Sequence, residues 1–332
     1  MTALPLIFAL IVAFSVFMYV VMDGFDLGIG MLFLFAPGDK ERDTMMDSIG
    51  PVWDANETWL VLGGTLLFSA FPIIYAVVLP ALYLPLMLML FALIFRGVAF
   101  EFRFRARTSK PIWDWSFALG SAIASFTQGL MLGAFIDGVP VADHRFAGGT
   151  FGFLSGFAIA SGFGVMAGYA LLGATWLIFK TAGTTQTFAR RAAPWVLIAT
   201  LAFVALTSLW TPFAHSYIRE RWFSLPNIFY LWPVPVITAL IAFGIWRTIN
   251  GPRDERPFLL SIALALLSYL GLGVSLWPYA IPASVTIFEA ASSQATLVFL
   301  AIGTAVALPV TLAYLFYAHW VFRGKTNENS GA

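Results

Sequence analysis

The segment Asp23-Gly24-Phe25-Asp26-Leu27-Gly28-Ile29-Gly30 lies within an apolar run from Leu4 to Phe35, in which Asp23 and Asp26 are the only charged side chains. On a helix, residues three positions apart share one face, so the two carboxyl groups are expected to lie together. A carboxylate at membrane depth is costly and therefore faces a bundle interior, a partner or a water path. The segment thus predicts a spanning helix with one shielded acidic face.

The same spacing recurs where the next apolar run begins. Asp54 and Glu57 stand three residues apart in Pro51-Val52-Trp53-Asp54-Ala55-Asn56-Glu57-Thr58-Trp59. We expect this second pair to lie at the mouth of the second helix.

The composition identifies the class of protein. Of the 332 residues, 60% are hydrophobic and 11% are charged, and the mean hydropathy is +0.86. A soluble domain carries roughly 25% charged residues, so the sequence predicts an all-α polytopic membrane protein. The net charge of +1 gives no sign of a nucleic-acid partner, and the absence of cysteine excludes thiolate metal sites and iron–sulfur ligation in this chain.

A spanning helix needs about 20 mostly apolar residues. On that criterion the sequence predicts nine helices, at Leu4–Phe35, Glu57–Val78, Leu82–Phe102, Trp115–Ile136, Thr150–Phe179, Pro194–Phe213, Ile228–Trp246, Pro257–Leu276 and Ser293–Val321. The first run would be roughly 48 Å long, against a hydrocarbon core of about 30 Å. We expect it to tilt, to protrude or to bend near Gly24, Gly28 and Gly30.

The distribution of basic residues predicts the orientation. With nine helices and the N-terminus outside, Arg145, Arg219 and Arg221 alone of the 18 Lys and Arg residues fall on the outer side, which leaves 15 inside. Cytoplasmic loops carry an excess of Lys and Arg. The sequence therefore predicts an outer N-terminus and an inner C-terminus.

The histidines do not suggest a haem site. Axial haem ligands are commonly His, Met or Cys. His144 falls in an outer loop, His215 at the outer end of the sixth predicted helix and His319 at the inner end of the ninth. Because none lies at mid-membrane depth, we expect this chain to hold no haem and no metal.

The acidic residues give a stronger signal. In the predicted topology the inner ends of the first three helices bring carboxyl groups, an amide and a guanidinium to one level, namely Asp23, Asp26, Asp54, Asn56, Glu57, Arg96 and Glu101. Arg96 would pair with one carboxylate and keep it ionised, while the others carry protons through water. The alternative is a static cluster of salt bridges in which acids near the start of the second helix act as caps. The residues alone do not decide between the two.

Three segments carry a resemblance to a known family. These are Asp23–Gly30, then Ser48-Ile-Gly-Pro-Val-Trp-Asp-Ala-Asn-Glu-Thr-Trp-Leu60, then Phe95-Arg-Gly-Val-Ala-Phe-Glu101. They resemble subunit II of the cytochrome bd quinol oxidases, including the cyanide-insensitive branch. The resemblance covers most of the chain and is densest over residues 19–103.

The resemblance implies a fold and a complex. The fold is one integral membrane domain of two four-helix bundles and one peripheral helix, which we assign to residues 1–137, 138–280 and 281–323, with a disordered tail at 324–332. The complex is a heterodimer in the bacterial inner membrane that oxidises quinol and reduces dioxygen. Its haem-bearing subunit I holds haems b and d or b-type variants, whereas this chain alone is not catalytic. A structurally bound quinone and a small single-helix accessory subunit are further candidates.

The resemblance also implies roles for individual residues. Asp26 and Asp54 match acids near the haem pair that are implicated in proton supply from the cytoplasm, and we assign Asp23 and Glu57 to the same path. Asn56, Arg96 and Glu101 are assigned to its polar support, and Trp59 matches a tryptophan associated with the oxygen path. Glu57 departs from relatives that carry glutamine there, which leaves open whether Asp54 or Glu57 carries the protons.

A transporter is the rival interpretation. An intramembrane cluster of Asp, Glu and Arg could bind a substrate or a cation. Transporters often have paired broken helices in two halves, whereas only the first helix looks interrupted in this sequence. The sequence therefore favours the oxidase subunit.

Overall fold

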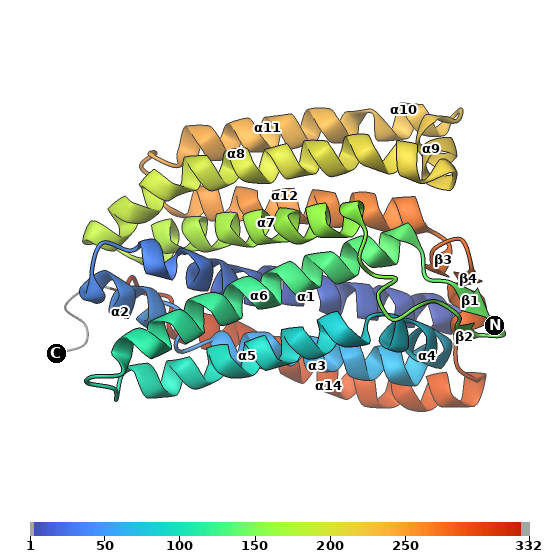
Figure 1. Ribbon diagram of the computed structural model, residues 1–332, viewed down its shortest axis with the longest axis horizontal. Coiled ribbons are helices and arrows are strands. Elements are labelled where there is room, and N and C mark those ends of the chain that lie inside the picture. The colour runs from blue at the N-terminus through green and yellow to red at the C-terminus, as the bar shows by residue number, and fades with distance from the viewer. Residues whose placement is uncertain (1–2, 327–332) are drawn as a thin grey trace.

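The computed structural model describes residues 3–326, which form a bundle of nearly parallel helices (Figure 1). The long helices are α1 (Ala3–Leu32), α3 (Trp53–Ala70), α4 (Pro72–Ala81), α5 (Tyr83–Arg103), α6 (Lys110–Asp137), α7 (Gly156–Lys180), α8 (Gly183–Ala214), α11 (Pro233–Thr248), α12 (Glu255–Leu276) and α14 (Gln294–Val321). Over these residues eight helices are long and apolar enough to cross a membrane, or nine if the bent pair α3–α4 forms one span. The predicted polytopic helical fold is confirmed.

Short elements close the two ends of the bundle. They are the 3-10 helix η1 (Phe33–Phe35), the helices α2 (Asp39–Asp47), α9 (Ser216–Phe223), α10 (Asn227–Leu231) and α13 (Ile287–Ala290), and two antiparallel hairpins, β1 (Val141–Ala142) with β2 (Arg145–Phe146) and β3 (Tyr279–Ile281) with β4 (Val285–Thr286). Helix α2 lies at one end, with α9, α10 and the hairpins at the other (Figure 1). We call the first the α2 end.

The helices pack in two groups that share one core. Helices α1, α3, α5 and α6 pack together, α7, α8, α11 and α12 form the second group, and α14 lies against α3 and α1. One buried cluster includes Phe25 of α1 and Trp176 of α7, whose rings stack at 4.1 Å. The division of the chain at residues 137 and 280 stays a prediction.

Glycine permits the contact between α1 and α7. A Cβ atom on Gly28 would lie 1.8 Å from the carbonyl oxygen of Tyr169, and one on Gly173 would lie 2.5 Å from the carbonyl carbon of Gly28. The backbones of the two helices therefore touch, as small residues allow in membrane bundles. Helix α1 remains helical through Gly24–Gly30 and changes to the 3-10 helix only at Phe33, so of the three expected ways to fit the long run, a break at the glycines is not the one observed.

The second predicted helix, Glu57–Val78, is wrong as a single element. The chain bends by 118° between α3 and α4. Pro72 follows the break at Phe71, and proline both lacks an N–H donor and disfavours the helical conformation of the residue before it. Ser292 satisfies the freed carbonyl groups, because its backbone N–H donates to Ala70 O at 2.9 Å and its hydroxyl to Ser69 O at 2.7 Å.

The sixth predicted helix, Pro194–Phe213, is too short. Helix α8 begins at Gly183. Its first turns are polar, and a hydropathy criterion therefore does not detect them. Of the predicted disordered tail, residues 324–326 are held in place, because Thr326 donates its backbone N–H to Lys180 O at 2.8 Å. The remainder, 327–332, lies outside the described residues.

Asp254 anchors this C-terminal segment. Partial burial alone would raise the pKa of Asp254, but hydrogen bonds from Lys325 and Gln186, with the charges of Lys325 and Arg190, hold it below its usual range. A carboxyl group with a lowered pKa stabilises its contacts above the unfolded value of about 3.9, and that contribution is lost as the pH falls through the lower folded value.

We expect Asp254→Asn to accelerate tryptic cleavage after Lys325 at neutral pH by up to about fivefold, because an exposed ion pair contributes about 0.2–1 kcal/mol. Limited proteolysis followed by mass spectrometry measures this rate. Glu255→Gln, at the adjacent exposed position, is the control. Equal cleavage rates in the two variants would contradict the anchoring role.

Candidate functional site

Arg96 of α5 is the centre of a buried ionic cluster. Its Nη1 atom lies 2.8 Å from Asp23 Oδ1 and 2.8 Å from Glu57 Oε1, and its Nη2 atom lies 3.6 Å from Asp26 Oδ2. The side chains of Arg96, Asp23 and Asp26 are 0% exposed. Helices α1, α3 and α5 thus each contribute to one site, which we call the Arg96 cluster.

Asn56 orients one of these carboxyl groups. Its Nδ2 atom donates to Asp26 Oδ2 at 2.9 Å and lies 3.4 Å from the carbonyl oxygen of Met22. The sequence predicted that Arg96 pairs with one carboxylate, whereas its guanidinium contacts three carboxyl groups. The Asn56 amide holds one of these, Asp26, in place.

The charges of the cluster do not balance. Three carboxyl groups surround one guanidinium, so full ionisation would leave a net charge of −2 at a largely buried site. Burying unpaired charge is costly, and a carboxyl group that binds a proton removes one such charge. A carboxyl group can also act first as an acceptor and then as a donor. The Arg96 cluster is therefore chemically able to take up and release protons.

Several polar atoms of the cluster have no hydrogen-bond partner among residues 3–326. The atoms without a hydrogen bond are Asp23 Oδ2, Asp26 Oδ1, Asn56 Oδ1 and Arg96 Nε and Nη2. Buried polar atoms are normally hydrogen-bonded to protein or to water. These atoms therefore offer sites where water molecules could join the carboxyl groups.

The cluster reaches the surface through Glu57. The Glu57 side chain is 29% exposed, whereas those of Asp23 and Asp26 are fully buried. Asp54, one helical turn earlier on α3, is exposed and makes no ion pair within the described residues. An exposed carboxyl group, a half-exposed one and two buried ones thus follow one another from the surface inward.

The structure brings together most of the predicted site. The predicted side chains that contact one another are Asp23, Asp26, Asn56, Glu57 and Arg96. Glu101 does not join them, because it is exposed and its carboxylate lies 3.8 Å from Arg105, just beyond the end of α5. Glu101 lies five residues beyond Arg96, so it is on a different face of α5 from the cluster.

Trp59 is buried beside the cluster. Its indole ring packs edge-on against Phe14 at 5.6 Å and forms a small apolar core with Tyr19 and Leu315. The side chain therefore fills the space between α1, α3 and α14.

Sequence reasoning missed a polar chain that continues from the cluster. Tyr169 donates its hydroxyl to Gln128 Oε1 at 2.8 Å, and Gln128 Nε2 donates to the Tyr19 hydroxyl at 2.8 Å. Tyr19 lies one turn before Asp23 on α1. The available signals were the four-residue spacing of Tyr19 and Asp23 and the single amide in the apolar middle of α6.

A second ionic cluster at the α2 end was also missed. Arg103 is fully buried and pairs with Asp43 of α2 and Asp114 of α6. Arg42 also bonds Asp114, at 3.0 Å, and Lys110 lies 3.3 Å from Asp43. These contacts fasten α2 to the ends of α5 and α6.

The histidines lie on separate elements. His144 is in the turn between β1 and β2, His215 is between α8 and α9 with Nε2 3.3 Å from Asp137 Oδ1, and His319 is in the last turn of α14. Within residues 3–326, no group of three or more His, Asp or Glu side chains is arranged to hold a metal ion.

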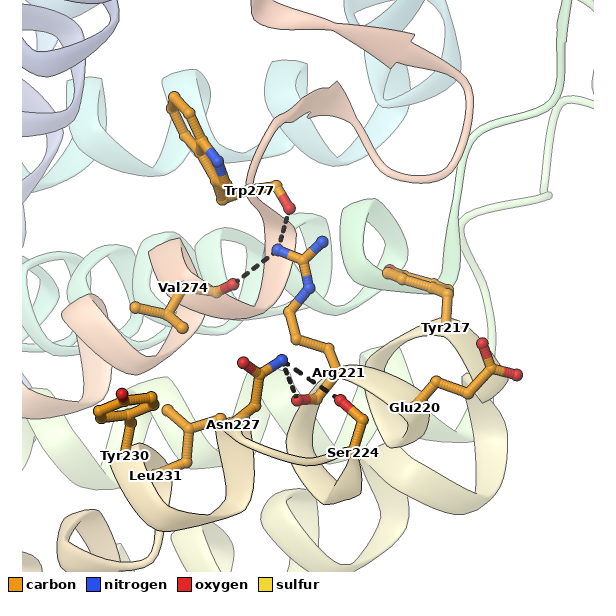
Figure 2. Close-up of a pocket in the computed structure, with 9 residues that line it drawn as sticks. All are labelled: Tyr217, Glu220, Arg221, Ser224, Asn227, Tyr230, Leu231, Val274 and Trp277. Carbon is orange, nitrogen blue, oxygen red and sulfur yellow. Dashed lines mark hydrogen bonds between the residues drawn. The ribbon is translucent and has the colours of Figure 1, made fainter.

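A cavity of about 730 Å³ lies far from this chemistry, at the α9–α10 end. Figure 2 shows Arg221 at its centre, where the guanidinium donates to Val274 O at 3.1 Å and to Trp277 O. The guanidinium therefore caps the end of α12. No residue of the predicted site lines this cavity.

Comparisons with known proteins identify the family. Residues 4–322 match the family model of cytochrome bd terminal oxidase subunit II. Cytochrome bd-I ubiquinol oxidase subunit 2 of Escherichia coli (strain K12) is 28% identical over 347 residues, covering 93% of this chain and 92% of that protein. Cytochrome bd ubiquinol oxidase subunit 2 of Bacillus subtilis is 28% identical over 321 residues, covering 92% of each.

A solved structure has the same fold. The bd oxidase from Geobacillus thermodenitrificans matches with a TM-score of 0.79 at 16% identity, covering 97% of this chain and 99% of that chain. The family model, the curated relatives and the fold agree with the resemblance noted in the sequence. This chain belongs to the family of cytochrome bd terminal oxidase subunit II.

Proposed function

We propose that this chain is the haem-free subunit of a quinol:oxygen oxidoreductase of the bacterial inner membrane, where it supports the haem-bearing subunit and supplies protons to it. The observation that carries the proposal is the Arg96 cluster, in which three carboxyl groups share one guanidinium. The names of the relatives, ubiquinol oxidases, supply the reaction class. Family membership favours this function over the independent transporter.

The proton path follows from the exposure of the carboxyl groups. Reduction of dioxygen to water consumes one proton for every electron, and this chemistry belongs to the haems of the partner subunit. Asp54 would accept a proton at the surface, Glu57 would pass it inward, and Asp23 and Asp26 would hold it beside Arg96. Water at the unpartnered oxygen atoms would connect these groups.

The partner subunit would cover the face of α3 that carries Asp54 and Glu57. Both side chains reach the surface of this chain, and carboxylates in contact with lipid are costly. Docking of subunit I there would shield both groups from lipid and place them beside its haems, while the cytoplasmic edge of the contact would stay open so that Asp54 can accept protons. Trp59, a buried residue of the same helix, would border the oxygen path.

The proposed orientation places the α2 end in the cytoplasm. We expect periplasmic and cytoplasmic reporters fused after Gly138 and after Lys325 to report opposite sides, with Gly138 outside. The physical reason is the excess of basic residues on the inner side. Activity of the same reporter type at both positions would contradict the orientation.

Purification tests the division of labour between the subunits. We expect an affinity tag on this chain to isolate a complex with haem absorption bands, and the chain separated from its partner to carry no stoichiometric haem. The triple substitution His144→Ala, His215→Ala and His319→Ala should leave the haem content per assembled complex unchanged. Loss of one haem from an assembled triple variant, or stoichiometric haem in the isolated chain, would contradict the proposal.

A further inference from the structure

A second cavity, of about 440 Å³, opens at the α2 end between η1, α2 and the start of α6. Its charged lining is Asp39, Arg42, Arg107, Lys110 and Asp114, and Trp115 also lines it. It shares no residue with the Arg96 cluster, so what binds there is independent of the proton path.

The acids of this cavity are already paired with cations. Asp114 bonds both Arg42 and the buried Arg103. Asp39 lies 3.7 Å from Arg42 and 3.7 Å from Lys110. The carboxylates therefore do not cancel all of the positive charge that lines the cavity.

Positive charge and hydrogen-bond donors are left over. Arg107 makes no ion pair with any carboxylate of residues 3–326, and Arg42 Nε is buried without a partner in that range. An unmet donor in a basic recess favours an anion with several acceptor oxygens, because charge-assisted bonds to a guanidinium are strong. A phosphate group has this chemistry.

The surroundings favour a lipid headgroup as the source of such a phosphate group. Trp115 is 56% exposed, and the neighbouring Ile112 and Phe35 are 65% and 74% exposed. Tryptophan is enriched at the membrane–water boundary, and the apolar side chains beside the recess would face lipid tails. Basic residues next to the ends of spanning helices bind anionic headgroups.

We propose that this cavity, which we call the headgroup site, binds the phosphate of an anionic phospholipid, with its acyl chains along Phe35, Ile112 and Trp115. Arg107 is the principal contact, and Arg42 and Lys110 complete the basic recess. A lipid bound there would rest against α2, the segment that joins α1 to α3 and so connects the two helices bearing the acidic residues.

Native mass spectrometry of the assembled complex, titrated with phosphatidylglycerol, tests the proposal. We expect Arg107→Gln to raise the dissociation constant of the first bound lipid about fivefold, which corresponds to about 1 kcal/mol for one basic residue near an anionic surface. Arg107→Lys should keep most of the affinity. Arg105→Gln is the matched control, because Arg105 is also basic and exposed, stands two residues away and does not line the cavity.

Further titrations distinguish the sources of phosphate and the charge requirement. Phosphatidylcholine should bind less tightly than phosphatidylglycerol, and millimolar inorganic phosphate should not displace the lipid. Equal effects of Arg107→Gln and Arg105→Gln would overturn the proposal. Equal affinity for the two lipids would also overturn it, as would binding of inorganic phosphate alone that Arg107→Gln abolishes while lipid binding is unchanged.

Discussion

Replacing Arg96 by glutamine is expected to abolish accumulation of the assembled complex. The guanidinium is fully buried and contacts three carboxyl groups, so its removal leaves negative charge in the bundle interior with no cation. Removal of one partner from a buried ion pair costs about 3–5 kcal/mol, a large fraction of the 5–15 kcal/mol that stabilises a typical protein. The haem absorbance of the purified membrane fraction measures assembly.

Two further variants separate charge from shape. Arg105→Gln removes a guanidinium from an exposed position near the end of the same helix and should leave the amount of complex unchanged. Combining Arg96→Gln with Asp23→Asn removes one unpaired charge and should restore part of the assembly. If Arg96→Gln alone assembled at the wild-type level, the cluster would not be held together by its charges.

Substitution of the two carboxyl groups nearest the surface, Asp54 and Glu57, should slow turnover. Asp54→Asn and Glu57→Gln keep the size of each side chain and much of its hydrogen bonding, but an amide cannot accept and then release a proton as a carboxyl group does. We expect each variant to assemble with full haem content and to consume oxygen more slowly. The double variant should be slower than either alone, and a tenfold loss would correspond to about 1.4 kcal/mol in the limiting barrier.

The two single variants show which of the two carboxyl groups carries the protons. Glu57 contacts Arg96 directly at 2.8 Å, whereas Asp54 makes no such contact. Glu101→Gln is the control, because Glu101 is an exposed acid outside the cluster. Loss of haem or of subunit I from the double variant would instead indicate a structural cluster, and wild-type oxygen consumption from pH 6 to pH 9 would rule out the relay.

Much of the site could be predicted because a charged side chain in an apolar helix must find a polar partner inside the bundle. Asp23, Asp26 and Arg96 stand in long apolar runs, and each needed a polar partner inside the bundle. The ordering of Asp54 and Glu57 could not be predicted, since residues three apart on a helix can both reach one face. The packing of α3 on α1 decides which of them points inward.

Other features depend on distant parts of the chain. The break between α3 and α4 lies at Phe71–Pro72 inside an apolar run, and a hydropathy average does not detect a bend. Its carbonyl groups are satisfied by Ser292, more than 200 residues later. The link from Tyr19 to Gln128 likewise spans a separation of 109 residues, so only the folded structure reveals it.

Proton uptake during oxygen reduction tests the central claim most directly. The fully reduced complex, reconstituted in vesicles with a pH-sensitive dye on the side of the α2 end, would be mixed with oxygen and followed in time. For the double variant Asp54→Asn/Glu57→Gln we expect electron transfer to begin normally while proton uptake from that side slows about tenfold, equivalent to about 1.4 kcal/mol. Uptake at the wild-type rate in a fully assembled Asp54→Asn/Glu57→Gln complex would contradict the account.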